Sequence, residues 1–198
     1  MKVKFILICC VSFLCAFCLV SILPVNGEEQ VYDNMIRLHV LANSDSDEDQ
    51  ALKLKVRDAI LKEAESIKAT NAADAYIKTE GCLKRFEKAA QSVLMEEGSD
   101  YSVKVTLGKE RYPERTYDGF TLPEGTYTSL RVLIGKAEGQ NWWCVLYPPL
   151  CTASASKKEE SFIAAGFTEE QYRTITHSEK KSFRFKFKIV EIFRDIFE

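Results

Sequence analysis

The sequence predicts a single α+β domain with a largely antiparallel sheet and helices packed on one face, preceded by an N-terminal apolar helix. The first part of the chain is apolar almost without interruption. After it, one strand-like segment precedes two helix-like segments, and several alternating strand-like segments follow. Such separation of helices from strands is typical of α+β folds. The 198 residues suffice for one domain, which we place at residues 28–198.

Residues 1–27 are typical of an export signal. A short positive start precedes the uncharged residues 5–23, and Pro24 ends the run. The run is also long enough to span the roughly 30 Å core of a bilayer. The segment is therefore either cleaved near Gly27 or retained as a single membrane anchor. In both cases the initial lysines stay in the cytoplasm, and residues 28–198 face outward.

The overall charge excludes several classes of function. The chain has 27 basic and 29 acidic residues, for a net charge of −2. No excess of positive charge exists to neutralise phosphates, so we expect no nucleic-acid partner. The two histidines leave little for a metal site, and no phosphate-binding loop is present. We expect no metal, no cofactor and no small-molecule substrate.

The first elements of the domain are a strand and a helix. Residues 35–42 alternate between two faces and predict the strand. Ser46 and Asp49 resemble a capping box, so a helix begins directly after Ser46. The acidic residues here also resemble a calcium loop, but Gln50 and Val56 stand where that loop needs glycine and glutamate. Helix capping is therefore the preferred interpretation.

A second helix is predicted after a short connection. Asn71 or Asp74 can cap its start, and it runs to Glu97 with Gly98 as its stop. Gly81 weakens the middle of this helix, because glycine is a poor helix former, and it can split the helix in two.

The next part of the chain is predicted to form the sheet. Residues 101–107, 126–135 and 141–147 alternate as strands, and the last two are joined by the hairpin-like KAEGQ. The turn-rich residues 111–125 separate the first strand from the second.

Two segments follow the sheet. Residues 159–174 predict a short helix, with a possible capping box from Thr168 to Gln171. The segment SFRFKFKIV then alternates phenylalanine with basic residues, as a strand does. Its basic face is either solvated or attracted to anionic headgroups or an acidic partner.

Two cysteines of the predicted domain lie close together in sequence. Cys144 and Cys151 flank Pro148 and Pro149, which enforce an extended or turned segment. On the outer side of the membrane a disulfide can persist, so either a bridge or two free thiols fits the pattern. Cys144 is also the one candidate nucleophile, with a histidine as base, although nothing in the sequence places a base beside it.

The pair Trp142 and Trp143 is the most unusual local feature. Adjacent residues of a strand face opposite sides, so one tryptophan is expected in the core. The other is either covered by a helix or exposed as a binding residue, because tryptophan is enriched at interface hot spots. His39 follows Arg37 on the first strand and is expected to be a structural histidine.

Two long segments resemble the stage II sporulation protein R family of endospore-forming bacteria. They are IRLHVLANSDSDEDQALKLKVRDAIL and LPEGTYTSLRVLIGKAEGQNWWCVLYPPLC. Together they make up about a third of the predicted domain, and the run NWWCVLYPPLC is highly specific. The N-terminal export segment also fits the family, whereas residues 152–198 match less distinctly.

The resemblance implies a signalling protein and not an enzyme. Members of the family are exported from the forespore into the space between forespore and mother cell. There they activate a membrane-embedded aspartic protease, sporulation protein GA, which processes pro-sigma-E. For binding this protease we select Trp142, Trp143 and Tyr147, with Arg37 and His39 as outside candidates. The alternatives are an exported hydrolase with Cys144 as nucleophile and a structural envelope protein.

Overall fold

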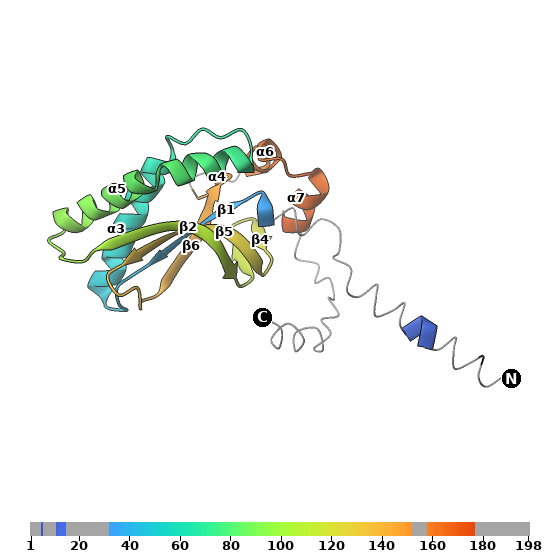
Figure 1. Cartoon of the computed structure of the whole chain (residues 1–198), viewed down its shortest axis with the longest axis horizontal. Helices are drawn as coiled ribbons and strands as arrows, with labels where there is room; N and C mark the ends of the chain where they lie inside the picture. The colour runs from blue at the N-terminus through green and yellow to red at the C-terminus, as the bar shows by residue number, and fades with distance from the viewer. Residues whose placement is uncertain (1–4, 6–10, 15–31, 152–157, 177–198) are drawn as a thin grey trace.

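A computed structural model of the chain describes residues 5, 11–14, 32–151 and 158–176 (Figure 1). Most of the predicted export segment 1–27 and all of the predicted final strand lie outside these residues. No helix among the described residues is both long and apolar enough to cross a membrane. The domain itself is α+β, as predicted.

The main sheet has four strands in the order β2-β5-β1-β6. The two central strands, β1 and β5, run parallel, whereas β1 with β6 and β2 with β5 are antiparallel. The sheet is therefore mixed, which corrects the prediction of a largely antiparallel sheet in its central pairing. The strands are β1 (Ile36–Leu41), β2 (Val103–Tyr112), β5 (Gly125–Ile134) and β6 (Asn141–Tyr147).

The predicted hairpin between the last two strands is wrong, because β1 lies between β5 and β6. The connecting loop is held instead to the loop that follows β1. The backbone N–H of Gly139 donates to the carbonyl of Ala42 at 3.0 Å, and the N–H of Gln140 donates to Asp45 Oδ1 at 2.7 Å. Asp45 thus has a structural role, which agrees with the preference for a structural interpretation over a calcium loop.

Three helices cover one face of this sheet (Figure 1). Ser46 caps the first, accepting from the Asp49 N–H at 3.2 Å, and Asn71 caps the second. The predicted long helix is split after Gly81, and Gly98 follows its end with a positive φ of 68°. The helices are α3 (Asp47–Ala64), α4 (Ala72–Gly81) and α5 (Leu83–Glu96).

The main hydrophobic core lies between these helices and the sheet. The even-numbered residues of β1 point into it and are almost fully buried, as the alternation predicted. Phe86 of α5 is completely buried in the same core. Other members are Val56, Ile60, Ala90, Leu94, Leu130 and Val132.

A second hydrophobic cluster includes residues from the opposite face of the sheet. A small hairpin, β3 (Arg115–Tyr117) and β4 (Phe120–Leu122), contributes to it from the stretch predicted as turns. The helices α6 (Lys158–Ala164) and α7 (Glu169–Thr176) also pack there, so helices do not contact one face only. Their separation at Gly166 divides the predicted helix 159–174 in two.

Candidate functional site

The odd-numbered side chains of β1 form a buried polar site on the second face of the sheet. Arg37 has no exposed surface. Its guanidinium carbon lies 3.9 Å from the ring centroid of Tyr112 and 4.9 Å from that of Tyr127. Its Nη2 donates a hydrogen bond to the hydroxyl of Tyr117. Aromatic faces attract a guanidinium electrostatically, so the rings partly compensate the cost of burying this charge.

The tyrosines around Arg37 remain neutral phenols at physiological pH. Burial raises the pKa of Tyr117, and the positive charge of Arg37 only partly opposes this effect. Burial also raises the pKa values of Tyr112 and Tyr127. The hydroxyl of Tyr112 forms a 2.6 Å hydrogen bond with the buried hydroxyl of Ser129. These tyrosines therefore offer Arg37 hydroxyl groups and aromatic faces but no negative charge.

His39 lies next to Arg37 on the same face and is held at both ring nitrogens. Nδ1 lies 2.9 Å from Glu110 Oε1, and Nε2 lies 2.7 Å from Asn141 Oδ1. The carboxylate of Glu110 can only accept, so Nδ1 is the donor in that bond, and the two partners together fix the orientation of the ring. The prediction of a structural histidine fits this geometry.

Glu110 connects His39 to a second arginine. Burial raises the pKa of this carboxyl, but hydrogen bonds from His39 and Ser129 and the charges of His39 and Arg131 outweigh burial and lower it overall. Nε of Arg131 lies 3.3 Å from Glu110 Oε1. Glu110 is therefore ionised at neutral pH.

The two tryptophans lie on opposite faces, and both are half-buried. Trp143 packs on His39 with ring centroids 5.4 Å apart, and the guanidinium of Arg115 lies 4.0 Å from its ring centroid. Trp142 packs against the helical core, and Arg57 of α3 lies 5.1 Å from its ring centroid. A guanidinium group thus lies over each tryptophan ring, so neither ring is an open apolar surface.

The structure brings together three of the five residues selected from the sequence. Arg37, His39 and Trp143 share one face, whereas Trp142 faces the helices. Tyr147 ends β6 and contacts both hydrophobic clusters. Their selection as binding residues remains a prediction.

Sequence reasoning missed the partners that complete this site. They lie on β2, β5, the β3–β4 hairpin and the start of β6, and they reach β1 only through the strand order. The alternation of β2 and β5 could have placed some of them on the right face, but not beside His39. The missed residues are Glu110, Tyr112, Arg115, Tyr117, Arg131 and Asn141.

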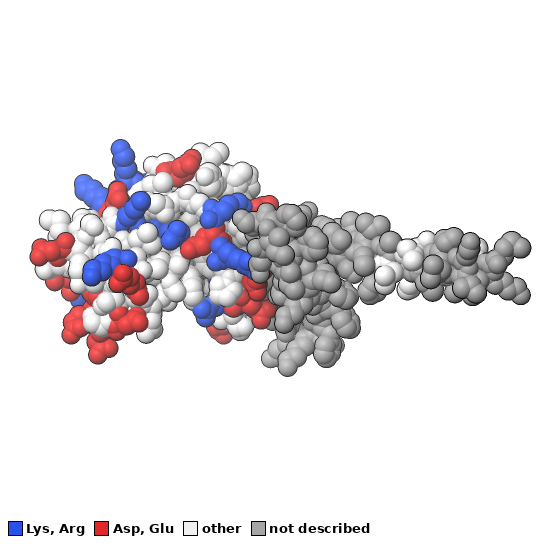
Figure 2. All heavy atoms as spheres, turned by 60° about the horizontal axis from the view of Figure 1, so that its bottom comes forward, with Lys and Arg blue, Asp and Glu red and all other residues white. Residues whose placement is uncertain are grey.

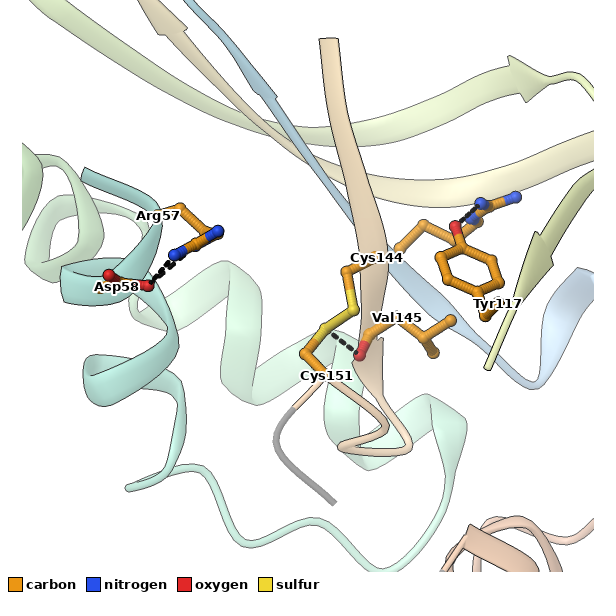
Figure 3. Close-up of a disulfide and its surroundings, with 7 residues drawn as sticks. Arg57, Asp58, Tyr117, Cys144, Val145 and Cys151 are labelled. Atoms are coloured by element: carbon orange, nitrogen blue, oxygen red, sulfur yellow. Dashed lines mark hydrogen bonds and ion pairs between the residues drawn. A yellow bond between two sulfur atoms is a disulfide. The ribbon is translucent and has the colours of Figure 1, made fainter. Parts of the chain in front are cut away.

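Cys144 and Cys151 form a disulfide with their Cα atoms 5.9 Å apart (Figure 3). Of the two open alternatives, the bridge is therefore the one present in the structure. The Sγ of Cys151 also lies 2.9 Å from the carbonyl oxygen of Val145, a contact and not a hydrogen bond, because a bridged sulfur has no proton to donate. Figure 3 shows β6 between Arg57 on one side and Tyr117 on the other.

The bridge also bears on the candidate nucleophile. The reactive form of cysteine is the thiolate, and a bridged Cys144 has none. In this state of the protein Cys144 cannot act as the nucleophile. No group of three or more metal-binding side chains occurs in the part of the chain that the structure describes.

Comparison with known proteins places these residues in a family. A sequence profile described as Stage II sporulation protein R matches residues 32–157. The Stage II sporulation protein R of Bacillus subtilis (strain 168) is 37% identical over 131 residues, which cover 64% of this chain and 58% of that protein. The chain thus spans a little under three fifths of the length of this relative. No solved structure matches the chain. Because the profile covers more than half of the chain, including the whole site around Arg37 and Trp143, the chain belongs to the stage II sporulation protein R family.

Proposed function

We propose that this protein is an exported sporulation signal that activates a membrane-embedded aspartic protease, sporulation protein GA. The activated protease then processes pro-sigma-E in the mother cell. The observation that carries the proposal is membership of the stage II sporulation protein R family across residues 32–157. The relative from Bacillus subtilis, 37% identical, supports the same role in sporulation.

Export to the space between forespore and mother cell is the second part of the proposal. The apolar run of residues 5–23 after a positive start supports it. The bridge between Cys144 and Cys151 supports it independently, because disulfides persist mainly outside the cytoplasm. After export the domain is either released or anchored by its N-terminal segment.

Activation requires that the domain bind the active form of the protease more tightly than the inactive form. A shift from about 1:99 to 99:1 needs roughly 5.5 kcal/mol of differential affinity. A few aromatic and arginine residues at the centre of an interface can supply an energy of this size. Trp143, which is half-buried and packs on the buried His39, is the best candidate for that centre.

The test is a cleavage assay in a host that does not sporulate. The host expresses the membrane protease and pro-sigma-E, with or without the full-length protein, and cleavage is followed over time. We expect cleavage only in the presence of the protein. An exported, folded protein that leaves pro-sigma-E intact contradicts the proposal.

The same assay tests the hydrolase alternative. Cys144→Ser and Cys151→Ser each remove the bridge, but only the first removes the proposed nucleophile. If the protein is a signalling domain, both variants lose the same amount of pro-sigma-E cleavage, because both lose only the stability that the bridge provides. If the protein acts as a hydrolase, Cys144→Ser reduces this cleavage far more than Cys151→Ser does.

A further inference from the structure

Several buried polar atoms around Trp143 lack hydrogen-bond partners. They are Nε of Arg115, Oε2 of Glu110, and Nε and Nη1 of Arg37. Nε of Arg131 is near Glu110 but outside hydrogen-bond geometry. Buried polar groups in folded proteins are almost always hydrogen-bonded. The unmatched guanidinium atoms show that these arginines are supplied with fewer acceptors than they can use within the described residues.

Arg115, Glu110 and Arg131 belong to one continuous row of side chains. Arg115 lies over Trp143, Trp143 packs on His39, and His39 is bonded to Glu110. Arg131 then contacts Glu110, and its side chain is 41% exposed. We call this row, together with the exposed Asn141, the arginine–tryptophan surface. Both ends of the row are guanidinium groups, and both lie in half-buried residues.

The charges of this surface are not balanced. Arg131 pairs with the carboxylate of Glu110, whereas Arg115 lies over Trp143 at the other end of the row. The buried Arg37 lies over the ring of Tyr112, which packs against Trp143. The three arginines and one glutamate together carry a net charge of +2. A partner that presents negative charge to this surface is therefore favoured.

We propose that the arginine–tryptophan surface binds a segment of a protein partner that presents acidic side chains, which Arg115 and Arg131 receive at the two ends of the row. The inference rests on the proposed function, because it names the chemistry of the partner. Guanidinium groups bind carboxylates with two parallel hydrogen bonds, a geometry that lysine cannot reproduce. Tryptophan and arginine are also the residue types most enriched at protein interfaces.

The mixed charges of the surface favour a peptide over a simple anion. The carboxylate of Glu110 lies beside the guanidinium of Arg131, so a bound molecule meets an acceptor as well as donors. A peptide segment offers N–H donors next to an acidic side chain, whereas an isolated phosphate group offers little besides acceptors. The partner therefore presents both kinds of group to this surface.

The test reverses the charge of Arg115 and removes the charge of Arg131 in the cleavage assay described above. The full-length variants Arg115→Glu and Arg131→Gln are compared with wild type and with Lys88→Glu, a charge reversal at an exposed residue of α5. The control is necessary because basic side chains are spread over the surface in Figure 2, so net charge alone could alter association. We expect cleavage to fall about tenfold with each arginine variant and to stay unchanged with Lys88→Glu.

A second variant separates contact from folding. Arg115→Lys keeps the charge but loses the planar stacking on Trp143. We therefore expect its level of pro-sigma-E cleavage to lie between those of wild type and Arg115→Glu. Thermal unfolding of every variant checks the fold. If Arg115→Glu unfolds, it is replaced by Arg115→Gln, which introduces no negative charge beside Trp143.

The outcomes distinguish this inference from the proposed function. If wild type causes no cleavage, the proposed function fails and the inference fails with it. If wild type and the folded arginine variants cause equal cleavage, the inference is overturned and the proposed function stands. If the variants lose binding to vesicles of anionic lipid to the same degree as they lose signalling, the surface binds lipid, and the inference is again overturned.

Discussion

The two faces of the central strand β1 differ in almost every physical respect. Ile36, Leu38 and Val40 pack against the helices in an apolar core. Arg37 and His39, which alternate with them, lie among tyrosines, a glutamate and further arginines. Both faces are buried, so burial alone does not distinguish them.

This difference indicates a division of roles between the faces. The helical face stabilises the fold through burial of apolar surface, an effect that does not depend on the direction of individual bonds. The polar face requires specific partners for every buried atom, and several atoms have none. Natural proteins keep such costly arrangements at functional sites. Stability is therefore expected to come mainly from the helical face and recognition from the polar face.

The strongest test of this division is Phe86→Ala on the helical face. Phe86 is completely buried, and its truncation leaves a cavity. We expect the free energy of unfolding to fall by about 3–5 kcal/mol in denaturant titrations. A loss below about 1 kcal/mol would break the comparison, because the apolar core would then contribute little.

A smaller effect is expected from Glu110→Gln on the polar face. Hydrogen bonds of a buried carboxylate to charged donors contribute about 1.5–3 kcal/mol, and their loss lowers the free energy of unfolding at neutral pH by that order.

The pH dependence of stability gives the same variant a second readout. The folded-state pKa of Glu110 is lower than its ordinary value of 4.5, so its contribution is present above that value. It is lost as the pH falls through the folded-state pKa. Urea titrations between pH 7 and pH 3 should therefore bring wild type and Glu110→Gln closer together in acid. Parallel curves over the whole range would show that Glu110 does not titrate as inferred.

The helix cap of α3 offers a third, still smaller change. Ser46 accepts the N–H of Asp49, and Ser46→Ala removes this bond. We expect a loss of about 1 kcal/mol in the free energy of unfolding. Cleavage of pro-sigma-E should be unchanged, because the cap belongs to the helical layer. A signalling defect in a stable Ser46→Ala protein would place function on that layer as well.

The smallest expected effect on stability sharpens the comparison most. Arg37→Met replaces a buried charge without a counterion by an apolar side chain of similar length. Such replacements are often neutral or stabilising. We expect an unchanged or raised melting temperature together with weaker cleavage of pro-sigma-E. A variant that is strongly destabilised would instead make Arg37 a structural residue of the fold.

Local signals in the sequence predicted many elements correctly. The alternation of β1, the caps at Ser46 and Asn71, and the weak point at Gly81 all depend on neighbours within a few residues. The reciprocal bonds between Thr168 and Gln171 have the same local origin.

The strand order could not be predicted in the same way. The loop after β5 resembles a hairpin turn, but its backbone N–H groups bond to a loop almost a hundred residues earlier. The polar site depends on this order, because Glu110 and Asn141 reach His39 from two different strands. Single residues of the site could therefore be selected from sequence, but their partners could not.

The disulfide has a consequence for the solution behaviour of the protein. Among the described residues β6 is an edge strand, and edge strands can pair with other chains through their free backbone groups. The covalent loop between Cys144 and Cys151 lies against this strand, with Sγ of Cys151 2.9 Å from the carbonyl oxygen of Val145. A strand of another molecule that approaches there meets the covalent loop, so we expect reduction of the bridge to make pairing along this edge easier.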